Sequence, residues 1–274
     1  MKIRRIQYKR CTELKNFKND IFRGNILCFF DYPSLKKIKE KFESYFFDCF
    51  KKTYNASLLN SFSITKVNDE INLFKLQEII KNCKFLKSSF TQFFIELGFD
   101  LNDLYIDEIT LRYSPRQGDM PYGKLKPTSA HRDTWASNIF HQINWWIPMH
   151  NVFSDNSIFI VPAYFKKKVP NNSKTWTFKK YKSILGYPSV PISNENFNPK
   201  DILNINLRSH EILCFSGNHI HGSNVGKRLR FNIETRTVSS SDPKNYKIPE
   251  NIDSLSNVTK KVWFKNIITG EKLG

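Results

Sequence analysis

The residues in this sequence that are best suited to chemistry are His131 and Asp133, which lie two positions apart in "SAHRDTWASN". On an extended strand, residues two apart point to the same side, so an imidazole and a carboxylate would meet at one point while Arg132 faces away. This spacing suits two ligands of a metal ion, but an ordinary surface turn can carry the same pair. A third ligand would distinguish the two interpretations.

The remaining histidines offer a third ligand in "CFSGNHIHGSNVGKRLRFNIETRTV", residues 214–238, where His219 and His221 follow a hydrophobic run. Two histidines and one carboxylate on neighbouring strands would occupy one face of an octahedral ion and leave three positions open. Non-haem Fe(II) oxygenases use this arrangement. The open positions can take a chelating co-substrate and dioxygen. From spacing alone, His219 and His221 are both candidates.

The segment "RFNIETR" could supply a cation for the far carboxylate of a co-substrate such as 2-oxoglutarate. As a strand it places Arg230, Asn232, Glu234 and Arg236 on one face and Phe231, Ile233 and Thr235 on the other. From inside a barrel, Arg230 could pair bidentately with a carboxylate. The competing interpretation is that these arginines are solvated strand residues. The sequence contains, in this order, an HxD, a histidine and an arginine that could point into the barrel. This combination favours a metal and co-substrate site.

At these residues the sequence resembles the iron(II)/2-oxoglutarate-dependent dioxygenases, and within them the phytanoyl-CoA dioxygenase-like branch. The similar blocks are "HRDTWASNIFHQINWWIP", "NSIFIVPAYF", "FSGNHIHGSN" and "RFNIETRTV", within about residues 106–238. The resemblance implies a double-stranded β-helix, a cupin-like jelly-roll barrel, with Fe(II), 2-oxoglutarate and O2 as cofactor and co-substrates. It is specific to the mechanism and not to the substrate.

Residue by residue, the resemblance implies that His131, Asp133 and His221 are the catalytic iron ligands and that Arg230 anchors 2-oxoglutarate. The family has a histidine followed by a small residue and then Ser or Asn, which "HGSN" satisfies and "HIHG" does not. The loop from His221 to the arginine is shorter than in many members, so Arg236 stays open as the anchor. Halogenating relatives have a small residue where Asp133 stands, so the resemblance implies a hydroxylase and not a halogenase.

Other side chains near these motifs are candidates for supporting roles. Gln142, Asn144 and Trp146 alternate along the strand after the HxD, so they could contact co-substrate or substrate, or equally well support the scaffold. We expect Trp135 and Trp145 to be core or pocket wall. Arg112 and Tyr113 are weaker candidates for the pocket.

The elements that must position these residues change in type along the chain. Residues 1–103 are predicted to be mainly helical, with an amphipathic helix in "PSLKKIKEKFESYFFDCF" capped by Ser34 and a second from about Leu73 to Leu97, ended by Gly98. Five strands are predicted afterwards, in "YIDEITLRY", "IFHQINWWIPM", "SIFIVP", "HEILCFSG" and "LRFNIETRTV". This order predicts an α+β fold with a jelly-roll core over 104–240.

The whole chain, 1–274, is predicted to form a single oxygenase domain. The core contains a lid or insert at about 163–207, and residues 241–274 form a C-terminal extension. The abundance of Phe and Tyr excludes a disordered chain. Five widely spread cysteines predict reduced thiols, and the absence of an apolar leader or spanning segment predicts a soluble, cytoplasmic protein without a membrane partner.

The predicted function is oxidation of a small-molecule substrate. The net charge of +18 leaves a second possibility, an oxygenase acting on a nucleic acid or a protein, with basic residues such as those of "FKKKVPNNSK" around the pocket mouth. The lysines are scattered along the sequence, however, which favours a small molecule. A third possibility is a cupin-like binding protein that has lost catalysis. The sequence predicts no particular oligomeric state.

Overall fold

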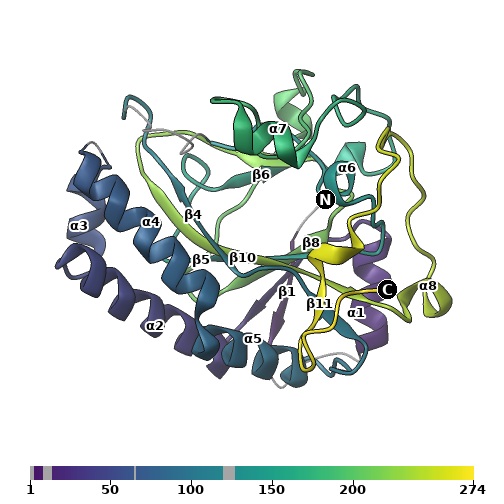
Figure 1. The fold of residues 1–274 in the computed structure, drawn as a ribbon, viewed down its shortest axis with the longest axis horizontal. Coiled ribbons are helices and arrows are strands. Elements are labelled where there is room, and N and C mark those ends of the chain that lie inside the picture. The colour runs from purple at the N-terminus through teal and green to yellow at the C-terminus, as the bar shows by residue number, and fades with distance from the viewer. Residues whose placement is uncertain (1–2, 9–13, 65, 120–126) are drawn as a thin grey trace.

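The computed structural model describes residues 3–8, 14–64, 66–119 and 127–274. Two β-sheets and a layer of helices make up this part of the chain (Figure 1). The helices are α1 (Leu14–Phe22), α2 (Pro33–Phe50), α3 (Ala56–Ser61), α4 (Val67–Asn82), α5 (Lys84–Glu96), α6 (Thr134–Ser137), α7 (Phe178–Ser183) and α8 (Asp242–Asn245). Short 3-10 helices lie at Pro162–Tyr164, Pro199–Asp201 and Lys261–Trp263.

The strands are β1 (Arg4–Gln7), β2 (Leu27–Phe30), β3 (Leu104–Ile106), β4 (Thr110–Ser114), β5 (Ile143–Pro148), β6 (Ile158–Ile160), β7 (Leu203–Asn204), β8 (Ile212–Ser216), β9 (His221–Ser223), β10 (Arg230–Ser239) and β11 (Lys265–Asn266). The larger sheet has the order β1-β2-β8-β5-β10-β3-β11, and β4 also pairs with β10. The smaller sheet has the order β7-β6-β9. Apart from the parallel β1–β2 pair, the strand pairs are antiparallel, so the predicted mixed fold with a mainly antiparallel sheet is confirmed.

The larger sheet buries a different set of side chains on each face. On β5, Ile143, Trp145 and Ile147 belong to the apolar core shared with α2, α4 and α5. Trp146 points to the other face and packs with residues of the smaller sheet, such as Ile158. This alternation follows from the two-residue period of a strand. It leaves Asn144 of β5 and Arg230, Asn232, Glu234 and Arg236 of β10 on the inner face, between the sheets.

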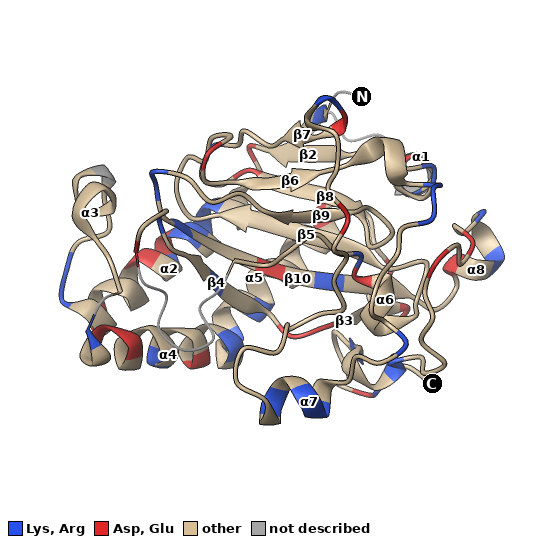
Figure 2. Ribbon diagram, turned by 90° about the horizontal axis from the view of Figure 1, so that it is seen from above, with Lys and Arg blue, Asp and Glu red and all other residues tan. Residues whose placement is uncertain are grey.

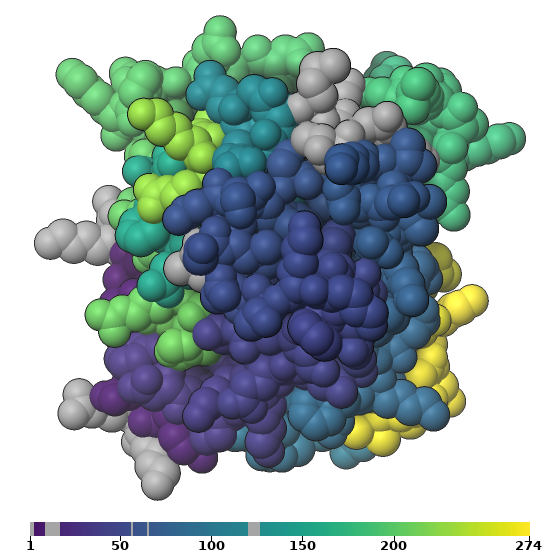
Figure 3. All heavy atoms as spheres, turned by 90° about the vertical axis from the view of Figure 1, so that its left-hand side faces the viewer, coloured from purple at the N-terminus to yellow at the C-terminus, as the bar shows by residue number. Residues whose placement is uncertain are grey.

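The helices of the N-terminal part cover the outer face of the larger sheet. Figure 3 shows one side of the molecule formed mainly by these residues, in purple and blue. The second predicted helix is two helices, because the chain turns at Cys83, whose ψ is 107° and whose thiol accepts a hydrogen bond from the Leu86 N–H. The predicted Ser34 cap is wrong. The position before the helix is Tyr32, and the Ser34 hydroxyl donates to Glu96 at 2.9 Å.

The larger sheet extends beyond the core range predicted from sequence. Strands β1 and β2 come from the N-terminal part, and β11, in the C-terminal extension, pairs with β3. All three are short, with two to four residues each, so they carry too little periodicity to be recognised. The insert at 163–207 contains α7 and supplies β7 to the smaller sheet.

The described residues bear on two predictions, that the cysteines are free thiols and that the chain has no membrane-spanning segment. Cys28, Cys49, Cys83 and Cys214 are free thiols, as expected, and Cys11 lies outside the described residues. None of the helices that the structure describes has the length and apolar character needed to cross a membrane.

Candidate metal centre

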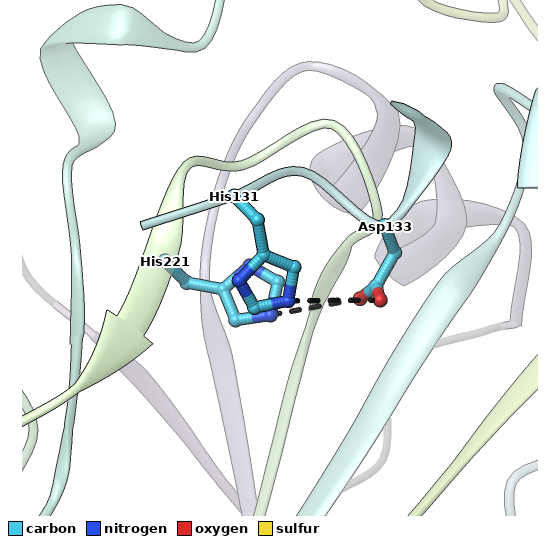
Figure 4. A group of neighbouring side chains, drawn as sticks. All are labelled: His131, Asp133 and His221. Carbon is cyan, nitrogen blue, oxygen red and sulfur yellow. Dashed lines mark ion pairs between the residues drawn. The ribbon is translucent and has the colours of Figure 1, made fainter. Parts of the chain in front are cut away.

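The two histidines of the candidate site are brought together by their backbones. His131 forms an isolated antiparallel bridge with His221, the first residue of β9. Asp133 follows the bridge with helical backbone angles, φ −64° and ψ −30°, immediately before α6. The prediction that both residues of the HxD lie on an extended strand is therefore wrong for Asp133. A bridge followed by a helical turn, rather than a strand, directs the three side chains to one point (Figure 4).

The three side chains have the geometry of a metal site. Their potential ligand atoms all lie within 4.8 Å of one another, and all three residues are buried. The two imidazole centroids are 4.2 Å apart. The Nε2 atoms of His131 and His221 lie 3.9 and 3.6 Å from the Asp133 carboxylate oxygens.

Hydrogen bonds on the far side of each ring select the tautomer. His131 Nδ1 lies 2.8 Å from the Ser129 carbonyl oxygen, and His221 Nδ1 lies 3.1 Å from the His219 carbonyl oxygen. Because a carbonyl can only accept, each Nδ1 must carry the proton. Each Nε2 then presents a lone pair toward Asp133, which is the orientation that a metal-binding histidine requires.

The electrostatics of the site favour the protonation states that ligate metals. Burial, together with the nearby His221, lowers the pKa of His131 to about 4, so this ring is neutral at pH 7. Burial would raise the pKa of Asp133, but His221, Arg236 and His131 outweigh it and hold the pKa below its usual value. A neutral imidazole and an ionised carboxylate fit a divalent first-row metal ion.

His219 does not belong to this cluster. Its ring is fully buried, with Nε2 3.0 Å from the Gly24 carbonyl oxygen and Nδ1 3.2 Å from the Ser216 carbonyl oxygen. Phe165 lies against it, with ring centroids 4.6 Å apart. His219 therefore holds the turn between α1 and β2 against the end of β8, and its carbonyl oxygen orients His221.

Both oxygens of Asp133 are held by neighbouring donors. Asn144 Nδ2 donates to Oδ2 at 2.5 Å, and Gln142 Nε2 in turn donates to Asn144 Oδ1 at 2.9 Å. Arg236 Nη1 donates to Oδ1 at 3.4 Å, and its Nη2 pairs with Asp107. Gln142, Asn144 and Arg236 thus act on the carboxylate of Asp133 in this structure.

Arg230 is a buried cation that forms no ion pair with a carboxylate of the described residues. Only 3% of the residue is exposed. Its donors contact Asn232 Oδ1, the carbonyl oxygens of Asn156 and Ser157, and Ser223 Oγ at 2.7 to 3.1 Å. Among the residues that the structure describes, no Asp or Glu forms an ion pair with it, since Glu234 pairs with Arg112. Burial, offset only in part by Glu234, lowers the pKa of Arg230 to about 10.

The three clustered residues and Arg230 line one cavity of about 780 Å³. Trp146 also lines it, with its ring 5.7 Å from the Arg230 guanidinium carbon. Trp145 contributes to the wall but packs mainly on the helix side, and Trp135 is buried. The outer wall is aromatic and comes from the insert and the C-terminal extension: Trp176, Phe178, Tyr181 and Trp263. Arg112 and Tyr113 line the same cavity.

Several residues that complete the site were not found from sequence. Asp107 holds Arg236, Ser223 holds Arg230, and Asp253 contacts the residue between the two HxD ligands. Ser223 could have been found, because it lies two positions after His221 and shares its strand face. Asp107 and Asp253 carry no local signal, since each is brought to the site by pairing with a distant segment.

The chain matches no protein-family model and no curated protein sequence. Among solved structures it is similar to the non-heme monooxygenase ThoJ in its apo form (TM-score 0.43, 10% identity, 73% of this chain and 70% of that chain). It is also similar to EvdO2 from Micromonospora carbonacea var. aurantiaca complexed with 2-oxoglutarate (0.40, 12%, 68% and 68%) and to EctD from S. alaskensis in its apoform (0.41, 10%, 79% and 73%). At these identities and TM-scores the likeness carries no functional argument, which must come from the site itself.

Proposed function

We propose that this protein is a non-haem dioxygenase that uses Fe(II), 2-oxoglutarate and O2 to oxidise a small molecule, releasing succinate and CO2. The observation that carries the proposal is the pairing of two features in one cavity. One is a buried His–Asp–His cluster with both Nε2 atoms facing the carboxylate, and the other is a buried arginine with no carboxylate partner among the described residues. We also propose that the two facing sheets form a double-stranded β-helix.

In this proposal His131 and His221 bind the iron through Nε2 and Asp133 through one carboxylate oxygen. These three ligands take one face of an octahedral ion and leave three positions for the co-substrate and dioxygen. When bound, the metal and 2-oxoglutarate supply the oxidising power. The protein fixes the ligand positions, excludes bulk water from the site and orients the substrate.

Arg230 is the proposed anchor for the far carboxylate of 2-oxoglutarate. A buried charge without a counter-ion is costly, so this guanidinium is poised to pair with an anion. It is held by Ser223, two residues along β9 from His221, and two strand residues span about 7 Å. A five-carbon dicarboxylate can bridge that separation. Arg236 is not the proposed anchor, because Asp107 and Asp133 already neutralise it.

The presence of a carboxylate at position 133 supports hydroxylation or a related oxidation rather than halogenation. The ligand atoms of Asp133 and of the two histidines lie close enough together to bind one metal ion. The Asp133 carboxylate would then occupy the coordination position that a halide needs. The ligand set therefore supports this type of reaction, and in this proposal the outer part of the cavity selects the substrate.

A small-molecule substrate is favoured by the volume of the cavity. Its volume of about 780 Å³ exceeds the need of 2-oxoglutarate alone and lies in the range of small-molecule sites. Residues 165–174, the basic stretch named as one that a polymer could use, do not line it. The lysines that line it are Lys81, Lys87, Lys265 and Lys272. Lysines and arginines lie on the neighbouring helices α2 and α4 and, away from these, on α7 and on α8 (Figure 2). A polymer substrate would instead require binding that weakens steeply with added salt.

The experiment that tests the proposal is substrate-free turnover of 2-oxoglutarate. Purified protein with added Fe(II) and O2 should form succinate, and chelation of the metal or His221→Ala should stop this reaction. A screen of small molecules for faster or tightly coupled turnover would then identify the substrate. Absence of succinate from protein that binds Fe(II) and 2-oxoglutarate would instead support a binding protein that has lost catalysis.

A further inference from the structure

Arg132, the residue between the two HxD ligands, is buried in a shell of acceptors. It is 1% exposed. Its Nη2 donates to the carbonyl oxygens of Tyr164 and Lys167 at 2.8 and 2.7 Å, and its Nη1 donates to the carbonyl oxygen of Asn218. Its Nε donates to Asp253 Oδ2 at 3.1 Å. From the sequence we expect this side chain only to face away from the metal, but its partners come from three separate segments.

Asp253, in the C-terminal extension, accepts hydrogen bonds from the residues around Asp133 and from the insert. Its carboxylate accepts from Arg132 Nε, from Trp135 Nε1 at 2.7 Å and from the Val169 N–H at 3.1 Å. Its backbone carbonyl accepts from Asn171 Nδ2 at 2.9 Å. Only 7% of its side chain is exposed. One carboxylate thus joins residues 131–135, which we call the ligand turn, to the insert.

We propose that Asp253 and Arg132 are positioning residues that fix the ligand turn, so that His131 and Asp133 face His221. The inference rests on the proposed metal site. The backbone bridge to His221 holds His131, but Asp133 lies beyond that bridge, and only Arg132 separates the two ligands. Trp135, in α6, is held by the same carboxylate on the other side of Asp133. Asp253 therefore fixes the turn from both sides of its aspartate ligand.

The test measures metal binding by the whole protein, independently of turnover. Co(II) is the probe, because its visible absorption reports both affinity and coordination geometry. Asp253→Asn keeps the shape of the side chain but removes the charge and faces Arg132 with an amide. Loss of a group that orients metal ligands typically weakens metal binding by about 10- to 100-fold, and we expect this weakening together with an altered spectrum. Trp135→Phe removes one donor to Asp253 and should weaken binding less, in the same direction.

The matched control is the buried ion pair between Lys18 and Asp242, whose atoms lie 2.6 Å apart and which contacts none of the three ligands. Asp242→Asn should lower stability and leave the Co(II) affinity and spectrum unchanged. The inference is overturned if Asp253→Asn and Trp135→Phe bind Co(II) as the wild type does, or if Asp242→Asn weakens binding equally. Should Asp253→Asn fail to fold, Trp135→Phe decides alone. A wild-type protein that does not bind Co(II) overturns the proposed metal site and this inference with it.

Discussion

The backbones of His131 and His221 are hydrogen-bonded to each other in both directions, with each N–H donating to the other's carbonyl oxygen at 2.9 Å. This reciprocal pair fixes the separation of the two backbones from which both imidazoles project. The ring of His219, two residues earlier, is directed to the Gly24 carbonyl oxygen instead. The two histidines of "HIH" therefore have different roles, and substitution should separate them.

His221→Ala should abolish metal-dependent turnover, because it removes one of three ligands. His219→Ala should keep metal binding but lower the free energy of unfolding by about 1 to 3 kcal/mol, since it leaves a buried carbonyl unpaired. Titration with Mn(II) and urea unfolding of both variants measure the two effects. Loss of metal binding in the His219 variant alone would reassign the third ligand.

Asn144→Ala should weaken metal binding without a comparable change in the 2-oxoglutarate requirement. Asn144 donates to Asp133 Oδ2, and partners of this kind typically change metal affinity by about 10- to 100-fold. Gln142→Ala acts one bond further away and should have a smaller effect in the same direction. Titration with Mn(II), followed by succinate assays at varied 2-oxoglutarate, tests this. An unchanged metal affinity in the Asn144 variant would show that the hydrogen bond does not orient the ligand.

The sequence predicts those parts of the molecule whose signals are local. Each of the five strands predicted after residue 104 overlaps a strand of the structure, since short runs of β-branched and aromatic residues bounded by turn residues are a local signal. The first of these, "YIDEITLRY", overlaps two strands, β3 and β4. The three residues His131, Asp133 and His221 meet as the motifs implied.

The failures have two physical causes. The break at Cys83 and the helical backbone of Asp133 are local turns at the starts of α5 and α6, which the periodicity of apolar residues does not reveal. The other failures arise because a distant segment decides the outcome. Asp253 contacts Arg132 across more than a hundred residues, so its carboxylate looks like any other in the sequence. The assignment of roles to Arg230 and Arg236 likewise needed Asp107, which sequence reasoning did not select.

The metal-free protein should lose stability as the pH falls from about 6.5 toward 4. Burial lowers the pKa of four histidines to about 4, from an ordinary value of 6.5: His131, His141, His150 and His219. In this window the unfolded chain binds protons that the folded chain does not. These histidines therefore contribute their full share of the free energy of unfolding above about pH 6.5, and this contribution decreases as the pH falls from 6.5 toward 4. Each pKa unit corresponds to about 1.4 kcal/mol, so several kcal/mol are at stake.

Urea unfolding in the presence of a chelator, at intervals between pH 7.5 and 4.5, measures this dependence. With metal present the fall should be steeper, because protons then also compete with the ion for His131 and His221. A free energy of unfolding that stays constant from pH 7 to 5 would contradict the depressed pKa values of these histidines.

Arg230→Ala should raise the 2-oxoglutarate requirement by about tenfold to a hundredfold, because a hydrogen bond to a charged group is worth about 1.5 to 3 kcal/mol and 1.4 kcal/mol is about one decade of affinity. Metal binding should survive, since the three ligands are other residues. Arg230→Lys should recover only part of the loss, as an ammonium lacks the planar fork. Arg236→Ala is the matched comparison. It removes the ion pairs to Asp133 and Asp107, so it should weaken metal binding and raise the 2-oxoglutarate requirement less than Arg230→Ala does. Succinate assays at varied 2-oxoglutarate, with Mn(II) titrations, separate the two arginines. If only the Arg236 variant raises the 2-oxoglutarate requirement, Arg236 is the anchor; if neither does, the co-substrate assignment fails.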